Sequence, residues 1–264
     1  MNHVMKDSLV IIPTYNEKEN VAEIVRAVLS QPSGFELLIV DDNSPDGTAE
    51  IVKSLMLEYP DRLHLEERAG KLGLGTAYIH GFRWALARHY EFIFEMDADF
   101  SHPPEDLNNL YHACKTDGND VAIGSRYVTG VNVVNWPMSR VMLSFFASYY
   151  VRMVTGMPFR DTTAGFKCYR RTVLETIDLD KVRFMGYAFQ IEMKFLAWKF
   201  GFNITEVPII FTDRTKGKSK MSGGIVKEAV LGVMQIKVGS LFKTYRRETE
   251  ADLEQSFNYA EKEA

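Results

Sequence analysis

Cysteine is scarce in this chain of 264 residues, which contains only Cys114 and Cys168. The two thiols do not have the spacing of a zinc site and are too few for a disulfide framework. We therefore expect a protein of a reducing compartment. A strong net charge is also absent, because 31 basic residues stand against 35 acidic ones. This near balance gives no reason to expect a nucleic-acid partner.

Long hydrophobic runs are missing as well. The longest stretch without a charged residue, 127–139, includes Thr, Asn and Pro. A helix that crosses a bilayer needs about 20 predominantly apolar residues, so we expect no transmembrane segment. The N-terminus leads almost directly into an apolar strand, which predicts that no signal peptide is present. These features favour a cytoplasmic protein that is soluble or peripheral at the cytoplasmic face of a membrane.

Apolar runs typical of buried strands alternate with helical patterns over the first half of the chain. The expected strands are 8–13, 35–41, 63–67, 90–94 and 121–125, with helices at about 17–29, 49–58 and 75–89 and from 103 onward. This alternation predicts an α/β fold with a doubly wound, mostly parallel sheet. The second half predicts strands at 166–169 and 204–211 and helices at 140–155, 188–200 and 225–243. We expect one domain over 1–244, closed by an amphipathic helix, and a charged, disordered tail over 245–264.

Two carboxylates, Asp97 and Asp99, follow the apolar strand at 90–94. Open α/β sheets bind ligands at the carboxyl ends of their strands. On an extended backbone, Asp-x-Asp sends both side chains to the same face, about 6–7 Å apart. Such a pair suits Mg²⁺ or Mn²⁺ and so indicates a metal-bound diphosphate. The alternative is a capped helix start or a solvated loop.

Polar residues also follow the first two strands. Tyr15 can stack on a base and Glu17 can accept hydrogen bonds from a purine or ribose. The alternative is a helix entrance that Asn16 caps. Asp41 and Asp42 end the next strand, where a carboxylate commonly binds a ribose. An Asx turn is the alternative there.

Several cations form a third set of candidates. Arg126 follows a strand end, Arg140 opens the apolar helix, and four cations lie within 214–220. Guanidinium groups bind phosphate in fork geometry, and a mobile loop at 214–220 could close on it. A solvated charged face is the alternative for that run. We interpret His102 as structure at a helix entry rather than as an acid–base group.

The apolar stretch 141–151 has two interpretations. Its many Phe, Tyr and Met side chains leave too little polarity for a free surface helix. The helix could lie in a membrane interface, or it could be buried in the core.

Four blocks, at 10–17, 41–48, 96–105 and 124–127, strongly resemble glycosyltransferase family 2. More narrowly, they resemble the dolichol-phosphate (polyprenol-phosphate) mannosyltransferases. Blocks at 161–167, 186–190 and 216–220 extend the resemblance, in order, through the second half. It implies a GT-A fold, a GDP-mannose donor, a polyprenyl or dolichyl phosphate acceptor, and Mg²⁺ or Mn²⁺.

The resemblance also implies roles for single residues. It suggests that the nucleotide is held by Pro13, Tyr15, Glu17, Val40 and Asp42. Asp97 and Asp99 would bind the metal, with backbone from Ala98, while Ser101 stands where some relatives carry a Gln that assists the metal. The positions that match phosphate-handling residues are Arg126, Arg140, Arg214 and Lys220.

The expected reaction is a metal-dependent, inverting transfer of mannose to a polyprenyl phosphate. Its rivals are the same chemistry with another donor such as UDP-glucose, and a non-catalytic nucleotide-sugar binding protein. A membrane surface is an expected partner, and a partner membrane subunit is compatible with the resemblance.

We expect Asp97→Asn and Arg126→Ala each to abolish turnover with little loss of fold, because one would lose the metal and the other a phosphate contact. Rate measurements on the purified variants check this. A normal rate in either variant would contradict the assignment.

Overall fold

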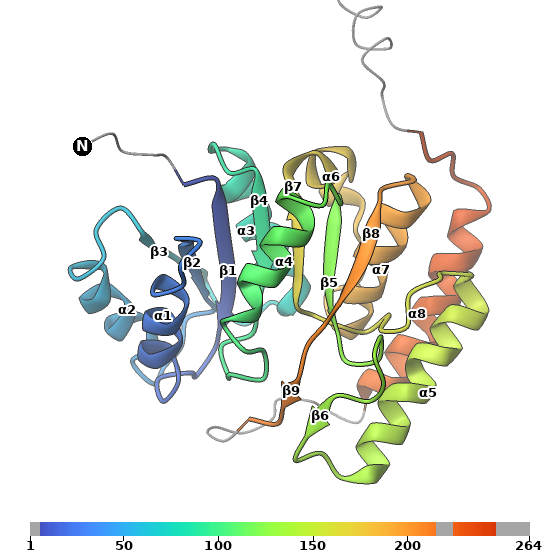
Figure 1. Ribbon diagram of the computed structural model, residues 1–264, viewed down its shortest axis with the longest axis horizontal. Helices are drawn as coiled ribbons and strands as arrows, with labels where there is room; N and C mark the ends of the chain where they lie inside the picture. The colour runs from blue at the N-terminus through green and yellow to red at the C-terminus, as the bar shows by residue number, and fades with distance from the viewer. Residues whose placement is uncertain (1–5, 215–223, 247–264) are drawn as a thin grey trace, which may run out of the picture.

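A central sheet of seven strands organises the part of the chain that the structure describes, residues 6–214 and 224–246 of this computed structural model (Figure 1). The strand order is β3-β2-β1-β4-β7-β5-β8. Only β7 runs antiparallel to its neighbours among these described strands. The strands are β1 (Ser8–Thr14), β2 (Glu36–Asp41), β3 (Leu63–Glu67), β4 (Phe92–Glu95), β5 (Val121–Ser125), β7 (Lys167–Arg170) and β8 (Ile204–Pro208). The expected doubly wound, mostly parallel sheet is confirmed.

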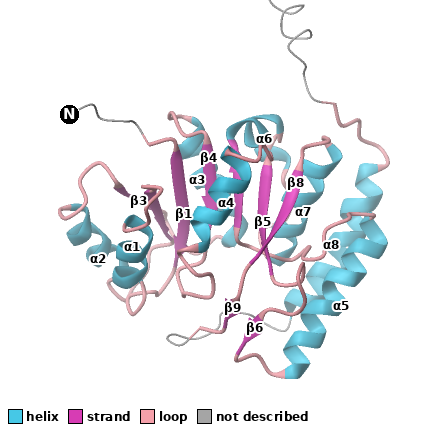
Figure 2. Ribbon diagram, viewed as in Figure 1, coloured by secondary structure: helices cyan, strands magenta, loops and turns pink. Residues whose placement is uncertain are grey.

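Helices cover both faces of this sheet (Figure 2). They are α1 (Val21–Leu29), α2 (Thr48–Met56), α3 (Leu74–Leu86), α4 (Asp106–Lys115), α5 (Met138–Thr155), α6 (Arg171–Thr176), α7 (Tyr187–Lys199) and α8 (Gly224–Ser240), with a 3₁₀ turn at Leu179–Lys181. Alternate residues of each strand point to opposite faces. Val10 and Ile12 of β1 therefore join the core layer under α1, while Leu9 and Ile11 join the layer under α3. This burial on both faces explains the continuous apolar strand runs.

The first helix begins later than predicted. α1 starts at Val21, not near Glu17, and Asn20 rather than Asn16 occupies its N-cap position. Asn16 has φ +54°, in the left-handed region that few residues other than Gly, Asn and Asp adopt readily. The chain therefore bends at Asn16 before the helix starts. Capping of α1 by Asn16 is wrong.

Three features of the second half were not predicted. β7 enters the sheet antiparallel between β4 and β5. The segment predicted as one strand over 204–211 divides into β8 and a short β9 (Phe211–Thr212), which pairs with β6 (Val133–Val134). Helix α6 follows β7 directly. Apolar alternation alone gives neither the direction of a strand nor its partner.

Helices α5 and α8 lie side by side at one end of the molecule (Figure 1), where the Tyr150 hydroxyl donates to the Val230 carbonyl at 3.1 Å. In α5, only Ser148, Val151 and Thr155 are buried. Six of its large apolar or aromatic side chains are 47–66% exposed: Met142, Leu143, Phe145, Phe146, Tyr149 and Met153. The interpretation that this helix is buried in the core is therefore wrong for most of its surface.

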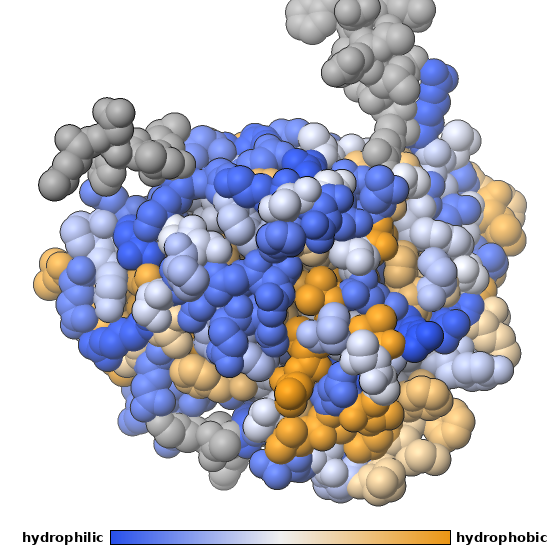
Figure 3. All heavy atoms as spheres, in the orientation of Figure 1, coloured by the Kyte–Doolittle hydropathy of each residue, from blue (hydrophilic) through white to orange (hydrophobic). Residues whose placement is uncertain are grey.

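α8 continues this exposed surface with Val230, Leu231, Met234 and Val238. In Figure 3, apolar residues gather over the lower part of the molecule, where α5 lies. We call the exposed apolar side chains of α5 and α8 the apolar face. Among the described helices, none is both long enough and apolar enough to cross a bilayer. The predicted domain end at 244 stays a prediction, because residues 247–264 lie outside the described part.

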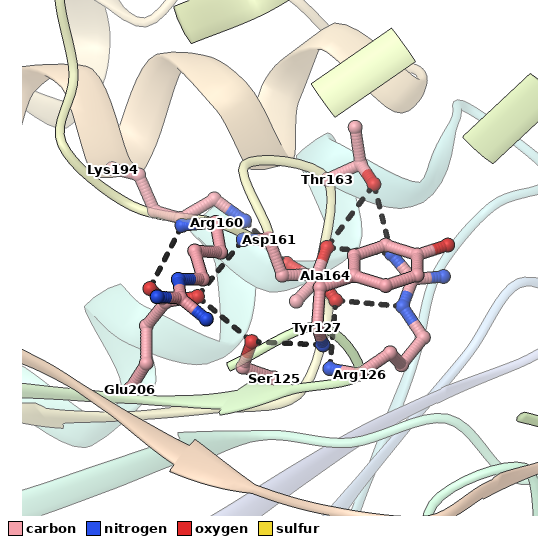
Figure 4. A network of polar contacts seen from close by, with 9 residues as sticks. All are labelled: Ser125, Arg126, Tyr127, Arg160, Asp161, Thr163, Ala164, Lys194 and Glu206. Atoms are coloured by element: carbon pink, nitrogen blue, oxygen red, sulfur yellow. Dashed lines mark hydrogen bonds and ion pairs between the residues drawn. The ribbon is translucent and has the colours of Figure 1, made fainter. Parts of the chain in front are cut away.

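A polar network joins the carboxyl end of β5 to β8 and to the loop before β7 (Figure 4). Glu206 of β8 accepts hydrogen bonds from the Ser125 hydroxyl at 2.7 Å and from the Asp161 backbone N–H at 2.8 Å. The Asp161 carboxylate is fully buried and accepts from Arg126 Nε at 2.7 Å and Nη2 at 2.6 Å. Burial alone would raise the pKa of Asp161, but the Arg126 guanidinium outweighs it and the pKa lies below its ordinary value.

We expect Asp161→Asn to lower the free energy of unfolding by about 3 kcal/mol, because it leaves the Arg126 charge buried without its partner. The folded-state pKa is lowered, so the carboxylate contributes its full stability above the unfolded pKa of about 4 and loses it only at lower pH. Denaturant unfolding at pH 5.5 and pH 8 should therefore give the same deficit.

Asp180→Asn is the matched control, because Asp180 pairs with Arg83 at an exposed site. Exposed ion pairs contribute little to stability. Equal stability of the two variants would contradict the structural role of Asp161.

Candidate functional site

Most of the predicted site residues gather where β1, β2, β4 and β5 end, at one edge of the sheet (Figure 1). β1 lies between β2 and β4, so the loops after these three strands are neighbours. The end of β5 lies beyond β7 on the far side of β4. The edge therefore has an acidic centre after β4, a polar side after β1 and β2, and a cationic side after β5.

The loops after β1 and β2 are held together by hydrogen bonds. The Asn16 N–H donates to Ser44 Oγ at 2.9 Å, and the Glu17 N–H donates to Thr48 Oγ1 at 3.0 Å. The Glu17 carboxylate accepts from Asn20 Nδ2 at 2.8 Å and is only 8% exposed. These contacts fix Glu17 beside the β2 loop. Both interpretations of Glu17, as part of a helix entrance and as an acceptor for a ligand, fit this position.

Tyr15 and Pro13 are both partly exposed at this edge. Lys71 Nζ lies 5.1 Å from the centre of the Tyr15 ring, within cation–π range. An aromatic face next to a cation suits a nucleotide, whose base can stack and whose phosphates are anionic. The predicted roles of Tyr15 and Pro13 stay predictions.

Asp41 and Asp42 have different environments. Asp41 is fully buried and accepts hydrogen bonds from Thr14 Oγ1 at 2.7 Å and from the Ser44 N–H at 2.8 Å. Its carboxylate therefore organises the turn, although through an N–H three residues on rather than the two of the expected Asx turn. Asp42 lies 2.5 Å from Arg68 Nη2, and burial raises its pKa in spite of that arginine. Asp42 is the better candidate for a ligand contact.

Arg68 was not among the residues predicted from the sequence. It follows β3 directly, and its Nη1 donates to Thr76 Oγ1 at 2.8 Å. The available signal was its position, one residue past the end of a strand at the same sheet edge. Val40, in contrast, is fully buried in the core, so only its backbone could contact a nucleotide, and its predicted role stays a prediction.

The carboxylates after β4 lie at the centre of the edge. Asp97 is partly exposed, whereas Asp99 is 5% exposed and is paired with Arg214, with Nη2 2.6 Å from Oδ2. Its other oxygen, Oδ1, accepts from the Ser101 N–H at 3.0 Å. Ala98, between them, is 4% exposed, so only its backbone could assist a ligand.

The donor set of Asp97 and Asp99 suits a divalent cation. Loss of solvent and the adjacent Asp99 charge raise the pKa of Asp97 to about 7, so the pair does not hold two negative charges easily. Among the described residues, no group of three or more His, Cys, Asp or Glu side chains could hold a metal. Further ligands would therefore be substrate oxygens or water, which Mg²⁺ readily keeps in its shell. The Ser101 hydroxyl stays an untested ligand.

His102 is structural, as its interpretation expected. It is 3% exposed, and its ring stacks on Phe166 with centroids 4.9 Å apart. Burial lowers the pKa of His102 to about 4, so the ring is neutral at physiological pH. The Asp97 N–H lies 3.4 Å from Nδ1. The ring therefore supports the backbone at Asp97 rather than carrying a proton in catalysis.

A second layer lies beneath the aspartates and was not predicted. Glu95, the last residue of β4, is fully buried and lies opposite Lys167 of β7, with 3.1 Å between Oε2 and Nζ. Gln190 of α7 donates to the same carboxylate oxygen at 2.6 Å. This buried pair fixes the end of β4 immediately before Asp97.

The predicted phosphate-binding arginines lie on the cationic side, and each has an acidic partner. Arg126 is 6% exposed and held by Asp161, as described above. Arg140 Nη1 donates to Asp213 Oδ1 at 2.8 Å, and its guanidinium lies 4.1 Å from the centre of the Trp136 ring. Arg214 pairs with Asp99. Lys220 lies outside the described residues, so its role stays a prediction.

The burial of Arg126 changes one expectation. Arg126→Ala would leave the buried Asp161 carboxylate without its cation, which is strongly destabilising. From the structure we therefore expect this variant to lose stability as well as turnover. Asp97→Asn, at a partly exposed position with a raised pKa, keeps the expectation of little loss of fold.

Comparison with known proteins agrees with this geometry. The sequence pattern described as glycosyl transferase family 2 matches residues 9–178. A polyprenol monophosphomannose synthase of Mycolicibacterium smegmatis is 50% identical over 228 residues, covering 86% of each chain. An undecaprenyl-phosphate mannosyltransferase of Micrococcus luteus is 47% identical over 225 residues, covering 85% of this chain and 91% of its own.

Solved structures show the same fold at lower identity. A glucosyl-3-phosphoglycerate synthase of Mycobacterium tuberculosis, in complex with Mn²⁺ and UDP, has a TM-score of 0.65 at 15% identity and covers 89% of this chain and 81% of its own. A mannosyltransferase of Pyrobaculum calidifontis, in complex with GDP-Man and Mn²⁺, has a TM-score of 0.55 at 17% identity, with coverage of 87% and 69%. The chain is a glycosyltransferase with a GT-A-like fold and belongs to glycosyl transferase family 2.

Proposed function

We propose that this protein transfers mannose from GDP-mannose to a polyprenyl phosphate, with inversion at the sugar and with the help of a divalent cation. The observation that carries the proposal is the Asp97–Asp99 pair between a nucleotide-compatible side and a cationic side of one sheet edge. The relatives named for polyprenol- and undecaprenyl-phosphate mannosyl transfer support the sugar and the acceptor. The complex of a structural neighbour with GDP-Man and Mn²⁺ supports the donor and the metal.

The donor nucleotide would bind at the ends of β1 and β2. Tyr15 offers a partly exposed aromatic face, and Glu17 and Asp42 offer carboxylates that accept hydrogen bonds from base or ribose. Arg68 holds Asp42 in place. This placement puts the diphosphate beside the end of β4.

Asp97 and Asp99 would hold the cation against the diphosphate. When bound, Mg²⁺ or Mn²⁺ stabilises the charge that grows on the departing diphosphate, which is worth several kcal/mol. The chain itself holds the two carboxylates in position through the buried Glu95–Lys167 pair and through the His102 ring. The expected loss of turnover in Asp97→Asn follows from this arrangement.

The acceptor needs positioning more than activation. A phosphate monoester has its second pKa near 6, so at neutral pH it is largely a dianion and already a nucleophile. Its oxygen would attack the anomeric carbon as the bond to the diphosphate breaks, and one such displacement inverts the configuration. The chain must overcome repulsion between two anionic groups. Arg214, which contacts Asp99, and Arg140, which pairs with the neighbouring Asp213, would serve this task.

We expect label from radiolabelled GDP-mannose to enter undecaprenyl phosphate with Mg²⁺ or Mn²⁺ and to be lost on chelation. UDP-glucose, tested in parallel, should transfer little. Extraction of the lipid product measures incorporation. Asp97→Asn should lower the rate by roughly 100-fold or more, because it removes a cation ligand.

The outcomes of this assay separate the candidate functions. Incorporation of label from UDP-glucose alone would identify UDP-glucose, and not GDP-mannose, as the donor. Donor binding without transfer would favour a non-catalytic nucleotide-sugar binding protein. Either result would overturn the proposed reaction.

We further propose that the apolar face rests on the bilayer from which the lipid acceptor comes. Arg140, in the first turn of α5, pairs with Asp213 beside the Arg214 that contacts Asp99, and the exposed apolar side chains follow along the same helix. A surface this apolar on a free monomer is unusual and marks an interaction site. We take a bilayer as the partner of the apolar face, because the proposed acceptor has a phosphate head and an apolar tail.

Liposome flotation tests this surface. The double change Phe145→Ser and Phe146→Ser should lower the membrane-bound fraction by about tenfold or more, because two large apolar side chains leave the interface. Leu57→Ser is the control, since Leu57 is 87% exposed on the distant α2 side. Unchanged flotation of a folded double variant would argue against the bilayer as occupant.

A further inference from the structure

The metal-binding carboxylate proposed above is already in contact with a cation of this chain. Arg214 follows β9 and extends its guanidinium to Asp99, with 2.6 Å between Nη2 and Oδ2. The contact is sheltered, because the Asp99 side chain is 5% exposed and that of Arg214 is 26% exposed. Shielding from water strengthens the attraction between such charges.

Both oxygens of Asp99 are engaged in this arrangement. Oδ2 faces Arg214, and Oδ1 accepts from the Ser101 N–H at 3.0 Å. A divalent cation on Asp99 would replace at least one of these contacts. It would also lie close to a guanidinium of the same sign, so the two cations repel each other.

Arg214 pairs with a proposed metal ligand, whereas the other cations named here pair with carboxylates that are not proposed to bind the metal. Lys167 is buried against Glu95, and Arg126 is buried against Asp161. Arg140 pairs with Asp213, which directly precedes Arg214. Among the described ion pairs, Asp99 pairs with Arg214 alone. Arg214 is also partly exposed, so it can leave Asp99 without opening the core.

We propose that Arg214 neutralises Asp99 until a divalent cation binds, and that the entry of the cation displaces Arg214 from the carboxylate toward the substrate phosphates. The inference rests on the proposed metal-dependent function and adds an exchange of one cation for another at Asp99. The free site thereby avoids two adjacent unpaired carboxylates. Arg214 is then available to the phosphates when the cation and its diphosphate are present.

Binding of Mn²⁺ without nucleotide tests the exchange directly. The electron paramagnetic resonance signal of free Mn²⁺ gives the dissociation constant. Arg214→Gln should bind Mn²⁺ about fivefold more tightly or better than the wild type, because the competing charge is gone. With GDP present, we expect Arg214→Gln to bind Mn²⁺ less tightly than the wild type, since the variant lacks a phosphate contact.

Arg140→Gln is the matched control. It removes the same charge nearby but from a different carboxylate, so its affinity for Mn²⁺ should change less than twofold if direct contact decides the effect. An equal gain in both variants would indicate a general charge effect and overturn the exchange. Unchanged or weaker Mn²⁺ binding by Arg214→Gln would also overturn it.

Thermal unfolding gives a second readout. Without Mn²⁺, Arg214→Gln should have a lower Tm than the wild type, because Asp97 and Asp99 then repel each other without compensation. Added Mn²⁺ should raise its Tm more than it raises that of the wild type. Neither measurement uses a sugar donor or a lipid acceptor, so failure of the exchange is distinguishable from failure of the mannosyl-transfer proposal.

Discussion

The concentration of negative charge at the end of β4 is the constraint on which the site depends. Glu95, Asp97 and Asp99 lie within five residues, and a buried carboxylate is costly unless a cation and hydrogen bonds compensate it. The antiparallel β7 brings Lys167 opposite Glu95 in the strand register. Arg214 compensates Asp99 from the loop after β9. The inserted strand is thus more than a variation of topology, because it supplies the buried charge that β4 requires.

The carboxylates along the sheet edge differ in the groups that offset their negative charge. Hydroxyl and backbone donors satisfy Asp41, and Arg68 pairs with Asp42. At the centre, Asp97 keeps a raised pKa because burial and Asp99 both disfavour its charge. A divalent cation bound at the centre would favour the charged form of Asp97. In the proposed reaction, a nucleotide diphosphate that arrives with a divalent ion would supply this cation, whereas a neutral sugar would not.

Local patterns predicted the elements and the main candidates, but not their partners. Asp97 and Asp99 could be placed at a strand end because the apolar run before them is unambiguous. The pairing of Glu95 with Lys167 could not be predicted, since it depends on the antiparallel direction of β7. The pairing of Arg126 with Asp161 could not be predicted either, because it joins residues 35 positions apart in the sequence. Val40 was assigned to the nucleotide by resemblance, and only the packed sheet shows that its side chain is enclosed.

The sequence also left two environments open for the apolar helix α5, because a continuous apolar pattern fits both a core and an interface. The exposure of its apolar side chains excludes burial in the core for most of the helix. Arg140, in its first turn, pairs with Asp213, which directly precedes the Arg214 that contacts Asp99. From there the helix extends 18 residues, or about 27 Å, with its apolar side chains exposed. In the proposed reaction, one helix therefore addresses both parts of the acceptor. A phosphate drawn to Arg140 need not leave the bilayer boundary, because the apolar face of the same helix would already lie there.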